Sequence, residues 1–321
     1  MPDSKQKFSK MFFVLAILSI ILAGIYLFGN LPAETWDYNI PRRINVLLAI
    51  FAVAAAVGLS SVTFQTITSN YILTPSIMGL DNLYVFIQTL IICFLGAGVT
   101  DTIIGQTEFL ITLAVMIFAS AGIFLFMFKL NSGDVFSVVL SGLVFGAAFG
   151  GLSNFMQVII DPSEFSILEG RMFASFNRIN LPLLGISSLI IIGVFFWISQ
   201  DFKSLDAVTL GKNHSIALGV RYHKIVLKTL VAVSLLTSAS TALVGPVTFL
   251  GILTVSIARF AFPTYRHAIL VPGSVLTGVC ILISGIIATE RILEFSVPLS
   301  AIINFIGGIC FICLVLKLKR V

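Results

Sequence analysis

Charge is scarce in this chain of 321 residues: Asp, Glu, Lys and Arg together make up 10% of it, whereas 58% is hydrophobic. A soluble domain has roughly a quarter of its residues charged. The mean hydropathy of +1.09 therefore argues against an ordinary soluble protein. The apolar residues form continuous runs without alternation, which in a bilayer indicates helices. We predict an all-α, polytopic membrane protein.

Cysteine and histidine are also rare, with four and three copies. The cysteines all lie in apolar runs, where Cys behaves as a small hydrophobe, and none makes a zinc or redox pattern. His214, His223 and His267 fall in the polar stretches between runs. The sequence shows no Ser/His/Asp set, HExxH motif or acidic cluster. We expect no catalytic residue and no metal site in this chain.

The chain lacks a phosphate-binding loop of the G-x-x-x-x-G-K-[ST] type. Its nearest candidate, Gly211-Lys212, is followed by Asn213 and has no upstream glycine at the right spacing. We therefore do not expect this chain to hydrolyse ATP. The middles of the apolar runs also lack charge, which argues against an ion-coupled secondary transporter, although neutral backbone sites can still bind sodium.

Ten apolar runs are candidates to cross a bilayer, and they cover residues 11–29, 44–65, 79–98, 108–128, 135–159, 181–199, 225–244, 246–260, 268–288 and 298–316. The first run could be a signal peptide, but it has no small-x-small cleavage pattern, so we expect a retained span. The basic ends place both termini in the cytoplasm. We expect one transmembrane domain over residues 1–321, in the cytoplasmic or inner membrane.

The largest break in hydrophobicity is the basic segment 200–224, QDFKSLDAVTLGKNHSIALGVRYHK, which this topology places in the cytoplasm. Gly211 and Gly219 can supply turns at either end of a short helix, whose apolar side chains would dock in a groove of a partner. A solvated basic loop explains the same residues. On the outer side, segment 160–180 mixes aromatic and charged residues. It is typical of a short surface helix, which either gates a cavity or simply lies at the interface.

Arg42 and Arg43 precede the second run on the outer side, where this topology places only five of the 19 lysines and arginines. Long cationic side chains there either reach lipid headgroups or bind carboxylates of a partner protein. The first alternative is structural and the second is functional.

The second run ends at Gln65 and is followed by Asn70 to Gly79, NYILTPSIMG. Pro75 removes a backbone donor and breaks a helix. At membrane depth such a break is tolerated where the chain lines a cavity or packs against protein. The segment is either part of a transport pathway or an ordinary loop.

Taken in order, these motifs resemble the FecCD-type permease family, the membrane subunits of binding-protein-dependent importers for iron-siderophores, haem and cobalamin. The resemblance runs from about Pro41 to the C-terminus. It rests on Pro41-Arg42-Arg43, on NYILTPSIMG, on Leu210-Gly211 with Leu218-Gly219-Val220, and on VGPVTFLGI (244–252) followed by Arg259. The chain departs from the family pattern at NYILTP (usually NPLA-P), at Lys212 (usually Glu) and at Val255-Ser256 (usually Pro-His).

The resemblance implies the architecture of a type II ABC importer permease and a ferric siderophore as cargo, with TPSIMGLD similar to a catecholate branch. It implies an extracytoplasmic siderophore-binding protein and two cytoplasmic ATPase subunits. Those subunits hold ATP-Mg, so this chain binds no cofactor. The second permease subunit is a related chain or a copy of this one. Nucleic acid is not an expected partner.

The resemblance also implies roles for particular residues. Docking of the binding protein is assigned to Arg42, Arg43 and Arg291, although the family's second outer arginine matches Thr289 here. Coupling to the ATPase is assigned to Leu210, Gly211, Ala217, Leu218, Gly219 and Val220. The translocation pathway is assigned to Gln65, Asn70, Pro75 and Gly79. The competing functions are an ion-coupled secondary transporter of a small solute and a membrane-embedded enzyme or assembly factor.

Overall fold

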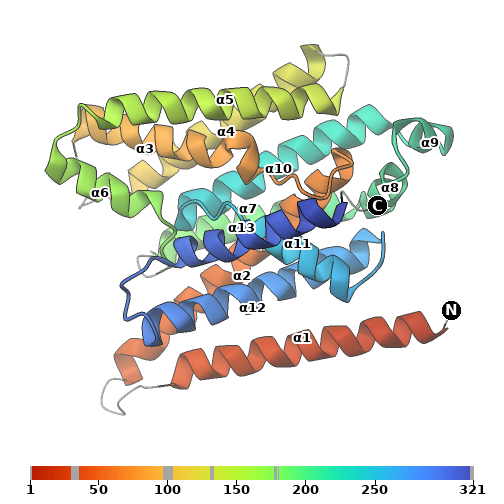
Figure 1. Ribbon diagram of the computed structural model, residues 1–321, viewed down its shortest axis with the longest axis horizontal. Helices are drawn as coiled ribbons and strands as arrows, with labels where there is room; N and C mark the ends of the chain where they lie inside the picture. The colour runs from red at the N-terminus through yellow and green to blue at the C-terminus, as the bar shows by residue number, and fades with distance from the viewer. Residues whose placement is uncertain are drawn as a thin grey trace.

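The computed structural model describes residues 2–29, 36–96, 104–130, 134–176, 179 and 181–318, and within these ranges it contains helices and no strand. The helices, labelled in Figure 1, are α1 (Pro2–Phe28), α2 (Trp36–Ile67), η2 (Ser76–Leu80), α3 (Asp81–Leu95), α4 (Ile104–Leu130), α5 (Val135–Gln157), α6 (Pro162–Met172), α7 (Leu181–Ser199), α8 (Phe202–Val208), α9 (Lys212–Ala217), α10 (Tyr222–Val244), α11 (Leu250–Ala261), α12 (His267–Arg291) and α13 (Leu299–Leu318).

In the described part of the chain, eight helices are long and apolar enough to cross a membrane, and Leu250–Ala261 and Leu299–Cys313 are shorter apolar stretches. This confirms the predicted all-α, polytopic membrane protein. Individual boundaries differ. The second helix starts at Trp36, well before the predicted residue 44, and the eighth apolar run becomes helical only at Leu250. Gly245, with a φ of +95°, ends α10, and the next helix, α11, begins only five residues later at Leu250.

The centre of the molecule is built from α2, α10 and α12. In the most apolar stretches of α2 and α10, 72% of the residues are buried, whereas in that of α1 only 6% are buried. α1 lies along α12 at the edge of the molecule (Figure 1). Small residues bring α2 and α12 together. A Cβ on Gly58 would lie 2.9 Å from the Oγ of Ser274, and one on Gly278 would lie 3.1 Å from the Cβ of Ala54. In lipid such close van der Waals packing holds helices together, because the hydrophobic effect does not distinguish helix from lipid.

A second group, α3, α4 and α5, lies on the side away from α1 (Figure 1). Here the π-helical turn η2 crosses α5 at two glycines. Gly79 has a φ of +94°, and a Cβ added to it would lie 2.3 Å from the Cα of Gly146. Any side chain at either position would separate η2 from α5. Gly79 is therefore a packing position inside this chain.

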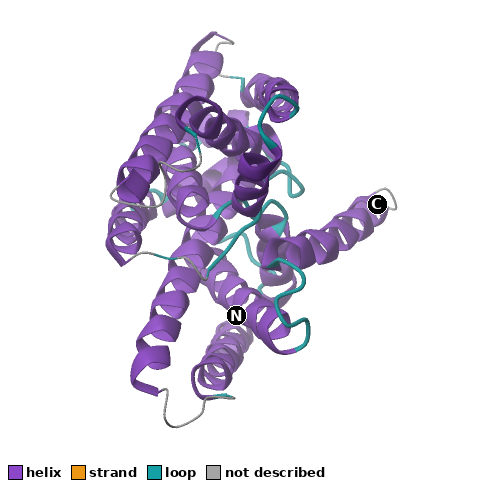
Figure 2. Cartoon of the chain, turned by 90° about the vertical axis from the view of Figure 1, so that its left-hand side faces the viewer, coloured by secondary structure: helices purple, strands orange, loops and turns teal. Residues whose placement is uncertain are grey.

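The two ends of the molecule have different elements. Both chain termini lie at the end that carries α8 and α9, and α6 lies at the opposite end (Figure 1). The helix α6 falls in segment 160–180, which the sequence predicted to lie on the outer side and of which residues 177, 178 and 180 lie outside the described part. An ion pair between Arg171 of α6 and Glu108 of α4 holds it, and Arg171 also donates to Gln88 of α3 at 3.0 Å. α13 extends away from the other helices at its C-terminal end (Figure 2).

We predict that Gly146→Ala destabilises the fold by about 1–3 kcal/mol, because overpacking a tight contact costs that much. Gly151→Ala is the matched control on the same helix, because nothing lies within 4 Å of its added Cβ. Thermal unfolding in detergent compares the two variants. A Gly146→Ala protein that melts together with the wild type would contradict the contact between α5 and η2.

Candidate functional site

The three arginines predicted to dock a binding protein line one cavity at the α6 end of the molecule. Its volume is about 270 Å³, and it is formed by the C-terminal ends of α1 and α12, the first turns of α2 and the connection after α12. The described lining residues are Tyr26, Asn39, Arg42, Arg43, Val46, Glu290, Arg291 and Phe295. With three guanidinium groups and one carboxylate, the cavity carries net positive charge.

The three arginines have different surroundings. Arg43 is half-buried, and its Nη1 donates to the carbonyl oxygens of Tyr26 at 2.6 Å, Leu27 at 3.2 Å and Gly29 at 3.1 Å. Arg291 Nη2 donates to the carbonyl oxygen of Ile25 at 2.7 Å. The last carbonyls of a helix carry partial negative charge and mostly lack partners within the helix, although that of Ile25 also accepts from the backbone N–H of Gly29 at 3.0 Å. Both residues therefore stabilise the end of α1.

Arg42 is exposed and also lines this cavity. It lies next to Arg43 in α2, and its side chain is accessible to a protein that approaches from this side. The guanidinium of Arg43 contacts three backbone carbonyls inside the chain. The docking role of all three stays a prediction.

The predicted pathway residues do not share one surface. Gln65 is fully buried, and its Oε1 accepts from Arg259 Nη2 at 3.4 Å. The guanidinium carbon of Arg259 lies 4.3 Å from the centre of the exposed Tyr71 ring. Two buried donors in this cluster, Gln65 Nε2 and Arg259 Nε, have no hydrogen-bond partner among the described residues. Sequence reasoning identified Gln65 but gave Arg259 no role in this contact.

The other three pathway residues lie in the connection from α2 to α3. Asn70 is exposed, and its Oδ1 accepts from the backbone N–H of Ile72 at 3.0 Å, a local turn that asparagine commonly makes. Pro75 is buried at the start of η2, and Gly79 packs against α5. Within this chain, these residues shape the connection that follows α2.

The polar segment 200–224 contains two short helices, α8 and α9. Gly211 with a φ of +93° and Gly219 with a φ of +80° stand at the two ends of α9. The buried Ser215 of α9 donates to the carbonyl oxygens of Ala207 at 3.0 Å and Gly211 at 2.6 Å, so α9 is attached to α8. The segment is therefore an ordered unit.

Apolar side chains are exposed on this unit. Leu210 is 59% exposed and Leu218 is 63% exposed, and Ile216, which sequence reasoning did not include, is 50% exposed. Of the other predicted coupling residues, Ala217 and Gly219 are exposed, and Gly211 and Val220 are partly covered. Three large aliphatic side chains are thus exposed within one short polar segment.

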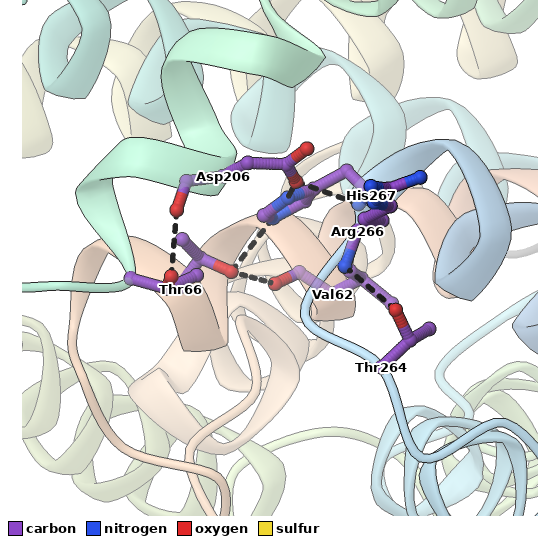
Figure 3. A network of polar contacts seen from close by, with 7 residues as sticks. Val62, Thr66, Asp206, Thr264, Arg266 and His267 are labelled. Carbon is purple, nitrogen blue, oxygen red and sulfur yellow. Dashed lines mark hydrogen bonds and ion pairs between the residues drawn. The ribbon is translucent and has the colours of Figure 1, made fainter. Parts of the chain in front are cut away.

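A polar network was not foreseen from the sequence. His267, which was expected in a loop, is the first residue of α12 and is 1% exposed. Its side chain lies between Asp206 of α8 and Thr66 of α2 (Figure 3). Asp206 and His267 are 61 residues apart in the chain, so no local spacing in the sequence could have brought them together.

Comparison with known sequences identifies the family. The sequence pattern of the FecCD transport family matches residues 8–317. The chain belongs to the FecCD transport family. It is 44% identical over 302 residues to the petrobactin import system permease protein YclO of Bacillus subtilis, which covers 94% of this chain and 95% of YclO. It is 34% identical to the petrobactin import system permease protein FatC of Bacillus anthracis, over 92% of this chain and 84% of FatC.

The fold of this FecCD-family chain is also known from a solved structure. A chain described as part of a metal-chelate type ABC transporter in an inward-facing conformation superposes with a TM-score of 0.82. The match covers 97% of this chain and 99% of the other at 22% sequence identity. The two chains therefore share one fold over nearly their whole length.

We predict that Arg43→Ala lowers the free energy of unfolding by about 1.5–3 kcal/mol, the usual contribution of hydrogen bonds to a charged group. Lys203→Ala, at an exposed position of α8, is the control and should change it by less than about 0.5 kcal/mol. Thermal unfolding of the purified protein measures both. Equal losses in the two variants would show that Arg43 does not stabilise the end of α1.

Proposed function

We propose that this chain is the permease subunit of an ATP-binding-cassette importer that moves a ferric siderophore into the cytoplasm. The observation that carries the proposal is its full-length similarity to two permeases that are both named for petrobactin import. Petrobactin is therefore the first candidate cargo. In this proposal the whole chain forms one transmembrane domain, and both termini lie in the cytoplasm.

The arginine-lined cavity is the proposed contact with an extracytoplasmic siderophore-binding protein. Arg42 and Arg291 are exposed there, and a guanidinium binds a carboxylate through two parallel hydrogen bonds. Arg43 contributes indirectly, because its hydrogen bonds hold the end of α1 beside the cavity. The outer helix α6 lies at the same end of the molecule (Figure 1).

The unit formed by α8 and α9 is the proposed contact with a cytoplasmic ATPase subunit. Its exposed Leu210, Ile216 and Leu218 fit an apolar groove. ATP and Mg²⁺ are bound by two such ATPase subunits, so this chain needs no cofactor and carries out no bond chemistry. Its work is a change between two conformations that the ATPase drives.

A second permease subunit completes the proposed pathway. In α13, Phe305 is 71%, Ile309 50% and Ile312 58% exposed, and the end of this helix extends from the molecule (Figure 2). The partner that covers α13 is a related chain or a second copy of this one. The Gln65–Arg259 cluster and the connection from Asn70 lie at the end of α2, where a pathway between two subunits would open to the cytoplasm.

The direct test is uptake of ⁵⁵Fe-loaded siderophores by cells that express this chain with its ATPase and binding protein. We expect uptake of ferric petrobactin, and complete loss of uptake when the ATPase carries an inactivating substitution in its phosphate-binding loop. A panel of other ferric siderophores defines the cargo. Uptake that continues with the inactive ATPase would overturn the proposal and favour an ion-coupled secondary transporter.

A second experiment tests the outer contact. Arg42→Glu reverses an exposed charge that lines the cavity. We expect it to weaken binding of the loaded binding protein by about tenfold or more, since like charges at an interface repel. Lys129→Glu, an exposed reversal at the end of α4, is the control. Binding to the permease in nanodiscs measures the affinity. An unchanged affinity of Arg42→Glu would remove the docking assignment.

A further inference from the structure

Asp206, His267 and Thr66 connect three elements that are distant in the sequence: α8, α12 and α2. The Oδ1 of Asp206 accepts from the backbone N–H of His267 at 2.8 Å and from its Nδ1 at 2.6 Å. On the other side of the ring, the Nε2 of His267 lies 2.8 Å from the Oγ1 of Thr66. Figure 3 shows the imidazole between the two partners. We call these three residues the polar joint.

The hydrogen bonds of the polar joint fix the orientation of the His267 ring and the position of the N-terminal end of α12. A carboxylate only accepts hydrogen bonds, so Nδ1 of His267 carries a hydrogen. The backbone N–H of His267 belongs to the first turn of α12, where donors have no partner within the helix and negative charge is favoured. Asp206 therefore acts as a helix cap supplied by another helix. The side chain of Arg266, the residue before α12, makes no capping hydrogen bond of its own.

The polar joint is covered by protein. His267 is 1% exposed, Thr66 is 5% exposed and the side chain of Asp206 is 23% exposed. Away from water, hydrogen bonds are stronger and a broken one costs more. The order Asp–His–Thr resembles that of a hydrolase, but the Thr66 hydroxyl is buried and also lies 3.0 Å from the carbonyl oxygen of Val62. The arrangement is suited instead to holding α8, α12 and α2 together.

The joint is linked to the surface that faces the proposed ATPase. Asp206 lies in α8, whose Leu205 and Val208 are almost fully buried. The neighbouring residue Ala207 accepts the hydrogen bond from Ser215 of α9. A displacement of the exposed side chains of α9 therefore moves α8, and with it the carboxylate of Asp206.

The joint is also linked to the proposed pathway. Thr66 lies in the last turn of α2, beside Gln65 and directly before the connection that contains Asn70. His267 begins α12, which packs closely along α2. One imidazole ring thus holds the beginning of α12 and the end of α2 at fixed distances from α8.

We propose that the polar joint transmits the movement of the coupling segment to α2 and α12, with Asp206 and His267 as positioning residues for transport. This inference rests on the proposed function as an ATP-driven importer. The competing explanation is that the joint only stabilises the fold. The two explanations differ in what a broken joint does to ATP hydrolysis and to uptake: loss of transmission lowers uptake per ATP, whereas loss of stability lowers both activities together.

The experiment uses the complete complex of permeases, ATPase and binding protein in proteoliposomes. It measures ATP hydrolysed per ferric petrobactin transported, and reports melting temperature and assembly beside it. We expect Asp206→Ala and Thr66→Val to raise this ratio about tenfold, within the usual range of coupling between sites. Leu218→Glu, which alters the proposed ATPase contact directly, provides a reference for lost coupling.

Conservative variants separate the hydrogen bonds from the packing. Thr66→Ser keeps the hydroxyl and should restore the wild-type ratio, whereas Thr66→Val has the size of threonine without the hydroxyl. Asp206→Asn keeps an oxygen that can accept and should give an intermediate ratio. Because Asp206 and Thr66 act through the same ring, the double variant Asp206→Ala/Thr66→Val should be no worse than Asp206→Ala alone.

An unchanged ratio in assembled Asp206→Ala and Thr66→Val complexes would overturn the proposal, as would a parallel loss of hydrolysis and uptake. A Thr66→Ser complex as poor as Thr66→Val would also count against it. If Asp206→Ala does not assemble, Thr66→Val decides the question.

A distance measurement keeps the two proposals distinguishable. Spin labels at Asn213→Cys and Ser69→Cys, both exposed positions, report the separation of α9 from the end of α2. In a wild-type joint this distance should stay constant when an ATP analogue is added, and in Thr66→Val it should change. If no siderophore is taken up, the cargo proposal fails, and this measurement still judges the joint: a change in the wild type, or none in Thr66→Val, rejects it.

Discussion

The close packing of α2 against α12 is the contact on which both candidate sites depend. Gly58 and Gly278 let the two backbones approach at distances that a larger residue would not permit, and in lipid such contacts supply much of the attraction between helices. Both helices extend from the arginine-lined cavity at one end to the polar joint at the other. The first turns of α2 carry Arg42 and its last turn carries Thr66. The length of this helix pair therefore sets the distance between the two sites.

The ends of the helices are completed by side chains from neighbouring helices. Arg43 and Arg291 donate to the last carbonyls of α1, and Asp206 accepts from the first N–H of α12. A helix end in a soluble protein can rely on water for these groups, but a membrane protein has less water available at its helix ends. The same residues that satisfy the backbone therefore also determine how the helices are arranged.

Sequence reasoning succeeded where the physical cause is local. The long apolar runs predicted the helices because a bilayer demands length and low polarity over consecutive residues, and Gly211 and Gly219 indicated where α9 begins and ends. It also selected three arginines that lie in one cavity. The sequence could not predict that Arg43 holds the end of α1, because the carbonyls that it contacts come within reach only when α1 ends beside α2. Likewise, Asp206 and His267 meet only through the packing of α8 on α12, and the contact of Gly79 with Gly146 forms only when η2 packs on α5.

The contact of Gly79 with Gly146 has a consequence for how this protein changes shape. Side chains of most packed helices interdigitate, so one helix can move past another only if rotamers change and energy barriers are crossed. Here two bare backbones touch, and the neighbouring Met78 is an unbranched, flexible side chain. Asn82, in the first turn of α3, also donates to the carbonyl oxygen of Gly146 at 2.9 Å. The connection after α2 is therefore attached to α5 both by backbone packing and by this hydrogen bond, so a movement of one element is passed to the other.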